Sequence, residues 1–461
     1  MNKISETRFP SSTLSRRNFG KAAVAMTALS YSRVLGANDR VGMGYIGLGN
    51  RGDQVHDAFL EHGDNATVAI CDLKDDYLDL AGKKSAARGA AVRYKDYRKL
   101  LEDKNVDAVA ICTPDHWHAV MFVAACKAGK DIYCEKPFSL TVFEGRRMVD
   151  AAAKYNRITQ VGLHRRSAPE IRKLAEMIHA GEIGKISASR AFHVRNDWPV
   201  GIGSPSNSAP PSKEIWEAWL GPAPEQPYNR NKAWYNFRWF YDFSGGQLTN
   251  FGVHYSDMMR MMMQLSVPRA VTAMGGKYIV NDNRQIPDTL VVLWEYDNPA
   301  SGAPALNSFE QYNANSAPGN AKRMELEFRG TKGTLYMQNA NWEIAPESNH
   351  SIPTKPNDPT DRDTSEWRAS FKEAMEAKQG KGSADTAFHT RNFLDCVKSR
   401  KQTNCPALEG HRSNVGPLIG NIAHKTKSYL LFDEKTERFT NNPDANKLLH
   451  YEYRKGYSIE L

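Results

Sequence analysis

Short apolar runs alternate with amphipathic segments along the first part of the chain. Val41 to Ile46 is typical of a strand, and a glycine turn after it leads to a helix containing Val55 to Leu60. Strands that alternate with helices predict parallel βαβ units in a doubly wound sheet. The further strands expected are Ala66 to Cys71, Asp107 to Cys112, Asp131 to Cys134 and Ile158 to Val161, with helices from His116 to Ala128 and from Thr141, where Glu144 completes a capping box.

The pattern changes beyond about residue 185, where longer strand-like runs follow one another. Such a series is typical of an open, mainly antiparallel sheet, so we expect an α+β C-terminal domain. The expected strands are Ile186 to Val194, Ala270 to Val280, Thr289 to Tyr296, Ala305 to Tyr312, Met324 to Phe328 and Gly333 to Met337. Segments 199–232 and 347–366 are interpreted as surface loops. The predicted organisation is a leader at 1–36, an α/β domain at 37–163 and a second domain at 164–461.

Composition is that of a globular enzyme: 461 residues, 41% hydrophobic and 25% charged, enough for two or three domains. The net charge is +9, of which residues 1–36 contribute 6 − 1 = +5. The remaining charge of about +4 is too mild to indicate nucleic-acid binding. No run after the leader is long enough to span a membrane, so no stable membrane anchor is expected.

The leader resembles a twin-arginine export signal. Arg16 and Arg17 precede an aromatic residue and a lysine, and a short apolar run ends near the small residues Gly36 and Ala37. The alternative is a basic start of the folded domain. Export predicts a periplasmic or secreted protein that holds any cofactor tightly. Of the six cysteines, Cys396 and Cys405 could form a local disulfide, which spacing alone leaves open, and no cysteine cluster of the metal-binding type occurs.

A glycine-rich turn follows the first strand and opens the first helix. Its G-x-G-x-x-G consists of Gly47, Gly49 and Gly52, and Asp72 ends the next strand. Glycines permit the tight turn, close approach to a pyrophosphate and close helix packing, while Asp72 suits the adenosine ribose and favours NAD over NADP. Asn50 and Arg51 complete the predicted cofactor loop, although Arg51 and Lys74 weaken the preference for NAD. The alternative is a glycine turn without nucleotide.

Three later motifs occur in a recognisable order. They are Thr113-Pro114 with His118, Glu135-Lys136-Pro137, and Gly245-Gly246 with His254 and Asp257. With the glycine turn, they resemble the glucose–fructose oxidoreductase / inositol dehydrogenase / rhizopine-catabolism (Gfo/Idh/MocA) family. The resemblance implies an N-terminal Rossmann domain, a C-terminal α/β domain whose open sheet often makes homo-oligomer contacts, and hydride transfer at a carbohydrate or polyol carbon.

The resemblance also implies residue roles. Lys136 lies where the family has the lysine between nicotinamide and substrate, and His254 lies at its catalytic histidine; Asn250 replaces the usual aspartate, which puts a simple proton relay in doubt. The nicotinamide-side loops contain Thr113, Pro114, Trp117, His118 and Glu135. A buried lysine or neutral histidine can accept a hydroxyl proton near neutral pH. A surface lysine and a satisfied core histidine are the structural alternatives.

Substrate contacts are expected from two segments. The aromatic segment 234–243 leads toward His254, and aromatic faces stack on sugar rings, although core packing explains most such residues. Its candidates are Tyr235, Arg238 and Asp242. His164 and Arg166 follow the sixth strand, where a solvated basic turn is the alternative, and Asp257 completes the list.

The function that these observations favour is an exported, NAD-dependent carbohydrate oxidoreductase with tightly bound cofactor and Lys136 and His254 as acid and base. A redox-neutral glycoside hydrolase, which oxidises, eliminates, adds water and reduces again, is the alternative, since Trp117-His118 matches part of a motif in such relatives. A binding or sensor protein is a third possibility, supported by Asn250 alone. We expect a sugar or glycoside substrate, a homo-oligomer, no metal and no nucleic acid.

Overall fold

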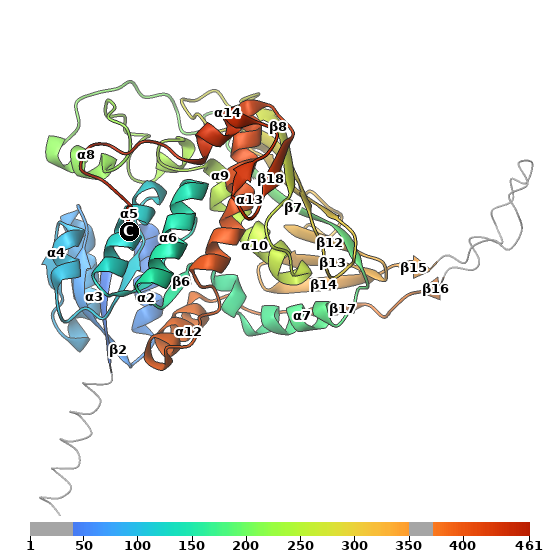
Figure 1. The fold of residues 1–461 in the computed structure, drawn as a ribbon, viewed down its shortest axis with the longest axis horizontal. Helices are drawn as coiled ribbons and strands as arrows, with labels where there is room; N and C mark the ends of the chain where they lie inside the picture. Colours follow the sequence, from blue (N-terminus) through green and yellow to red (C-terminus); the bar gives the residue numbers. More distant parts are fainter. Residues whose placement is uncertain (1–39, 350–371) are drawn as a thin grey trace, which may run out of the picture.

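The computed structural model describes residues 40–349 and 372–461. Two sheets lie side by side with helices between and around them (Figure 1). The predicted export signal at 1–36 lies outside the described residues, as does most of the predicted loop at 347–366. No helix in the described part of the chain is both long and apolar enough to cross a membrane.

The first sheet has six parallel strands in the order β3-β2-β1-β4-β5-β6, as expected for a Rossmann domain. Its strands are β1 (Val41–Ile46), β2 (Asn65–Cys71), β3 (Val92–Tyr94), β4 (Ala108–Ile111), β5 (Asp131–Cys134) and β6 (Thr159–Val161). The helices between them are α2 (Asn50–Leu60), α3 (Asp75–Ser85), η1 (Ala86–Arg88), α4 (Tyr97–Glu102), α5 (Asp115–Lys127) and α6 (Val142–Lys154). The doubly wound prediction is confirmed, and the capping box that opens α6 is present.

The second sheet is large and mostly antiparallel, with one parallel pair, β7 and β10. Along its path lie β17 (Lys378–Gly380), β14 (Asn341–Pro346), β13 (Gly333–Gln338), β12 (Leu326–Gly330), β7 (Ile186–Asn196), β10 (Ala305–Tyr312), β9 (Thr289–Tyr296), β8 (Ala270–Gly276), β18 (Leu430–Asp433) and β19 (Arg438–Phe439). The short β11 (Ala314–Asn315) pairs with β7, and β15 (Ser348–Asn349) pairs with β16 (Lys372–Glu373). The open, mainly antiparallel sheet that the sequence predicted is therefore confirmed.

The remaining helices are η2 (His164–Ser167), α7 (Pro169–His179), α8 (Lys213–Leu220), η3 (Asn236–Trp239), α9 (Gly246–Asn250), α10 (Gly252–Met263), α12 (Thr386–Ser399), α13 (Ala407–Thr426), α14 (Pro443–Asn446) and η4 (Lys447–Leu449). Of these, α9, α10 and α13 contact strands of the second sheet, whereas α12 packs on α2 of the first domain. Met258 of α10 and Phe309 of β10 belong to one buried apolar cluster, and Trp294 of β9 donates to the Gly416 carbonyl of α13 at 2.9 Å. Burial of this apolar area is the main stabilising term.

Parts of the last ninety residues, α12 and the end of the chain, return to the first domain. Phe393 of α12 packs edge-on against Phe59 of α2 and Tyr133 of β5, with ring centroids 6.0 and 6.1 Å apart. Tyr453 donates a hydrogen bond of 2.6 Å to Glu144 of α6. The end of the chain crosses over the first domain beside α5 (Figure 1). Segments that the sequence assigned to the second domain therefore complete the core of the first.

One local expectation is corrected, and one open question has an answer. Segment 199–232 is not loop throughout, because it contains α8, whose N-cap Ser212 accepts from the Ile215 N–H at 3.1 Å. Cys396 and Cys405, whose pairing the spacing left open, are both free and buried thiols.

Candidate active site

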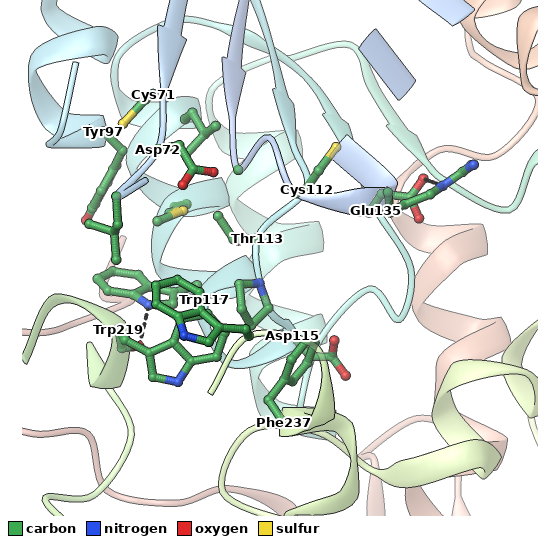
Figure 2. A pocket seen from close by; sticks show the side chains of 18 of the residues that line it. Cys71, Asp72, Tyr97, Cys112, Thr113, Asp115, Trp117, Glu135, Trp219 and Phe237 are labelled. Carbon is green, nitrogen blue, oxygen red and sulfur yellow. Dashed lines mark hydrogen bonds and ion pairs between the residues drawn. The ribbon is translucent and has the colours of Figure 1, made fainter. Parts of the chain in front are cut away.

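A cavity of about 450 Å³ opens at the carboxyl ends of β1, β2, β4 and β5. This edge of a doubly wound sheet is where such folds bind ligands. Figure 2 shows Asp72 on one side, Glu135 on another, and Trp117, Trp219, Asp115 and Phe237 gathered at the far end. The predicted residues that line the cavity are Gly47, Gly49, Asn50, Arg51, Asp72, Thr113, Pro114, Trp117, Glu135, Lys136, Tyr235, Arg238 and Asn250.

The glycine turn has the backbone that a dinucleotide site needs. Gly47 has φ +85°, and a Cβ there would lie 2.8 Å from the backbone of Cys112 and Thr113. A Cβ on Gly52 would lie 2.0 Å from the Gly47 carbonyl oxygen, so this glycine permits close packing of α2. A Cβ on Gly49 would meet nothing nearer than Tyr77 at 3.5 Å. The space above Gly49 and the N-terminus of α2 therefore fit a pyrophosphate.

Asp72 is held rigidly at the end of β2. Its Oδ2 accepts from the Leu48 N–H at 2.7 Å, and its Oδ1 accepts from the Lys74 N–H at 2.9 Å. Burial raises the pKa of Asp72, while these two backbone donors oppose the rise. Lys74 pairs with Asp76 at 3.1 Å, so its charge is partly compensated. A fixed carboxylate with remaining lone pairs suits two ribose hydroxyls.

Glu135 and Arg51 connect the glycine turn to the Glu-Lys-Pro turn. Arg51 Nε donates to Glu135 Oε1 at 2.9 Å, and the backbone N–H of Lys136 donates to Glu135 Oε2 at 3.1 Å. The Glu135 side chain is 4% exposed. This ion pair neutralises both charges and orients the turn that carries Lys136.

Lys136 is partly buried and held by one residue of α9. Its Nζ donates to Asn250 Oδ1 at 2.6 Å and to the Asn250 carbonyl oxygen at 3.1 Å. Burial lowers the pKa of Lys136 to about 8, against the opposing charges of Glu135 and Asp115. A lysine with this pKa has an appreciable neutral fraction near neutral pH and can act as a base. The surface-lysine alternative is thereby excluded.

His254 lies one turn beyond Asn250, behind the cavity wall. Its ring is 5.5 Å from that of His164, centroid to centroid, and neither Nδ1 has a hydrogen-bond partner among the described residues. Burial lowers the pKa of His254 well below its usual value, and the nearby charge of Lys136 adds to this. Both histidines are therefore neutral, and His254 lies within reach of the Lys136 charge, although neither histidine lines the cavity itself.

Sequence reasoning missed Asp115 and most of the aromatic wall. Asp115, in the first turn of α5, accepts a hydrogen bond from Ser244 Oγ at 2.5 Å, and burial raises its pKa. The wall residues that were missed are Tyr97, Trp219, Trp234, Phe237 and Tyr457. Trp117 Nε1 donates to the Trp219 carbonyl at 3.0 Å, which ties α5 to α8. The position directly after Thr113-Pro114 was the available signal for Asp115.

Four predicted contacts are corrected because these side chains bind other parts of the protein. His118 lies with Nδ1 2.8 Å from the Pro137 carbonyl and Nε2 2.9 Å from the Thr113 carbonyl, so it supports the loops from behind. Arg166 and Asp257 form a buried ion pair at 2.7 Å, away from the cavity. Asp242 accepts from Gln226 at 3.2 Å and is not part of the lining. Within residues 40–349 and 372–461, no three metal-type side chains gather into a possible metal site.

Comparison with known families agrees with this geometry. The profile of the Gfo/Idh/MocA family for its NAD-binding Rossmann fold matches residues 41–163, and its C-terminal α/β domain profile matches 168–278 and 370–459. The chain belongs to the Gfo/Idh/MocA oxidoreductase family. Its first domain is accordingly an NAD-binding domain, and the glycine turn and Asp72 are the residues here that fit NAD.

Individual relatives match about a third of the chain. Myo-inositol 2-dehydrogenase of Thermotoga maritima is 38% identical over 144 residues, 31% of this chain and 42% of the relative. D-glucoside 3-dehydrogenase of Escherichia coli K12 is 30% identical over 159 residues, 34% of this chain and 44% of the relative. The chain thus matches less than half the length of these two relatives.

Solved structures show the same fold over most of the chain. An oxidoreductase domain protein from Kribbella flavida superposes with a TM-score of 0.62 at 19% identity, covering 86% of this chain and 100% of that chain. A levoglucosan dehydrogenase in complex with NADH and levoglucosan gives a TM-score of 0.61 at 18% identity, covering 85% of this chain and 99% of that chain.

Proposed function

We propose that the protein oxidises a secondary hydroxyl of a carbohydrate with NAD, and that Lys136 accepts the hydroxyl proton. The observation that carries this proposal is the position of Lys136, which lines the NAD cavity with its pKa lowered to about 8 and its ammonium held by Asn250. The dehydrogenases of inositol and glucosides among the relatives support a polyhydroxylated substrate.

The chemistry removes two particles from one alcohol group: a hydride from its carbon and a proton from its oxygen. NAD, when bound, supplies the acceptor for the hydride that leaves this carbon. The hydroxyl proton goes to the neutral form of Lys136, and the C–O bond becomes a carbonyl. In the reverse direction the protonated lysine returns the proton. Glu135 fixes the turn that carries the lysine, and Asn250 aims its Nζ.

His254 is proposed as the second acid–base group of the site. Asn250 cannot carry a proton as the family's aspartate can, so it orients Lys136 but relays nothing. The imidazole of His254, next to that of His164, is neutral and its pKa lies below that of Lys136, so it can pass a proton onward from the Lys136 region but does not keep it. The aromatic wall around Trp219 and Phe237 excludes water from the reacting centre.

Export and tight cofactor retention remain part of the proposal. They rest on the twin-arginine pattern at residues 16–21, and a homo-oligomer is proposed from the family resemblance. An exported enzyme meets no replenished NAD pool, so the cofactor must be reoxidised by a second carbonyl substrate or within a redox-neutral cycle. Denaturing the exported protein and identifying the released nucleotide by mass tests this point; an empty protein would contradict it.

A substrate panel tests the proposed reaction. NAD-loaded protein is mixed with myo-inositol, levoglucosan, glucose and its glycosides, and with glucuronate and galacturonate, and reduced nicotinamide is followed by absorbance. We expect NADH together with a product lighter by two hydrogens, and neither in the Lys136→Met variant. Absence of both products with every substrate, in protein that binds NAD, would contradict the proposal. Release of the aglycone without net NADH would favour the hydrolase alternative.

A further inference from the structure

Arg238 lines the cavity, and its guanidinium has no direct hydrogen-bond or ion-pair partner among the described residues. It belongs to η3 and lines the cavity together with Lys136 and Asp115. Its guanidinium lies over the ring of Tyr235 at 4.2 Å and near that of Phe237 at 5.4 Å. Among the residues that the structure describes, no carboxylate forms an ion pair with Arg238 and no group accepts a hydrogen bond from it.

The other cavity-lining arginines and the lysine at the adenosine end have partners. Arg51 pairs with Glu135 at 2.9 Å, Lys95 with Asp75 at 2.7 Å and Arg98 with Asp96 at 3.2 Å. At the Lys136 end, Arg238 and, when it is protonated, Lys136 face one carboxylate that has no arginine partner, that of Asp115, which is bound to Ser244 and whose pKa rise both charges oppose. The oxidised nicotinamide adds a further positive charge. A neutral ligand would leave this excess uncompensated in a partly desolvated site.

The stacking of Arg238 also determines what it can bind. The guanidinium lies over aromatic rings, which accept no hydrogen bond in their plane, so its N–H donors stay available, and their planar fork matches the two oxygens of a carboxylate. Hydroxyl groups satisfy such a fork less well, because they carry no charge. The arrangement is therefore a site for an anionic, two-oxygen group beside the proton acceptor.

We propose that the substrate is an acidic carbohydrate, a uronate or related sugar acid, whose carboxylate is bound by Arg238. This inference rests on the proposed function, because it names the substrate class of the same site. Another source of anionic oxygens is the cofactor's pyrophosphate. The glycine turn and the N-terminus of α2 serve that group, whereas Arg238 shares its end of the cavity with Lys136, Asp115 and Ser244.

Binding to the reduced, unreactive complex tests the proposal without requiring turnover. NADH-loaded protein is titrated with D-glucuronate and D-galacturonate and with the neutral D-glucose and D-galactose, using tryptophan fluorescence because Trp219 and Trp234 line the cavity. We expect each uronate to bind at least about tenfold more tightly than its neutral counterpart, the difference made by one charge-assisted pair. Equal or weaker uronate binding, or no saturable binding of either uronate, overturns the proposal.

Arg238→Gln identifies the residue responsible. We expect it to weaken uronate binding at least about tenfold while changing neutral-sugar and NADH affinity by less than about threefold, and Arg238→Lys to restore only part of the loss. Arg230→Gln is the matched control, because it makes the same charge change at an exposed position that does not line the cavity. It should leave uronate affinity unchanged. Loss of NADH affinity in Arg238→Gln with uronate affinity retained would assign the arginine to the pyrophosphate and overturn the proposal.

These titrations, taken together with the substrate panel on NAD-loaded protein, separate the two proposals. Arg238-dependent uronate binding without oxidation of any substrate would leave this inference standing and remove the dehydrogenase function. Oxidation of neutral sugars with no preference for uronates would leave the function standing and remove this inference.

Discussion

Replacing Lys136 by methionine removes the proposed base while keeping most of the side-chain volume. A general base contributes about 10²- to 10⁴-fold to the rate. We therefore expect the rate of hydride transfer to fall by at least about a hundredfold. Cofactor affinity should change little, because the Lys136 ammonium forms no hydrogen bond with the glycine turn or with Asp72.

The pKa of Lys136 also sets how the rate of alcohol oxidation should depend on pH. Because burial lowers the pKa of Lys136 to about 8, about a tenth of the lysine is neutral at pH 7 and about a hundredth at pH 6. The rate of alcohol oxidation should therefore rise about tenfold per pH unit below pH 8 and level off above it. The variant should lose this rise.

Single-turnover absorbance of NADH, measured from pH 6 to pH 10, is the assay for both effects. Lys130→Met is the control. Lys130 is buried just before β5, at the opposite end of that strand from Lys136, and its ammonium donates to the Asp103 and Val106 carbonyl oxygens. This control variant should keep the wild-type profile wherever the protein stays folded. A Lys136→Met variant with the wild-type rate, or with the same dependence on pH, would refute the role of this lysine.

Three further predictions concern the cofactor. Gly47→Ala should abolish NAD binding and lower the melting temperature, because φ is +85° and the added Cβ would lie 2.8 Å from backbone atoms. Gly63→Ala, with open space around the added Cβ, should do neither. Calorimetry and NAD titration check both variants. Asp72→Ala should weaken NAD about tenfold or more and reduce discrimination against NADP, measured as a ratio of dissociation constants; an unchanged ratio would contradict the ribose role. Tyr457→Ala should speed NAD release, because its ring packs on Trp117 at 5.4 Å over the cavity, and stopped-flow displacement that shows no change would exclude a retaining role.

Local backbone constraints made the cofactor end predictable from sequence. Gly47 and Gly52 stand where the backbone and close packing require glycine, and Asp72 ends a strand as the doubly wound pattern demands. The Glu135-Lys136-Pro137 turn was recognisable by its resemblance to the family motif, because its two functional residues are adjacent in sequence. Such features depend on neighbours in sequence, so spacing carries the information.

Long-range packing determined what the sequence could not show. Tyr457 reaches the cavity only because the end of the chain returns to α5, and Trp219 does so only through α8, which the Pro- and Ser-rich surroundings concealed. Arg166 and Asp257 were predicted as substrate contacts from their position, but each is the other's ion-pair partner. Pairing across the fold thus decides which polar side chains remain available for a ligand.

The most direct test of the central claim follows the transferred atom. NAD-loaded protein is incubated with a carbohydrate deuterated at its alcohol carbons. The nucleotide is then released by denaturation, and its mass is measured by mass spectrometry. The account predicts reduced nucleotide carrying one deuterium in the wild-type protein and unlabelled, oxidised NAD in the Lys136→Met variant. Oxidised NAD without deuterium from the wild-type protein, across neutral and acidic sugars alike, would contradict hydride transfer at this site.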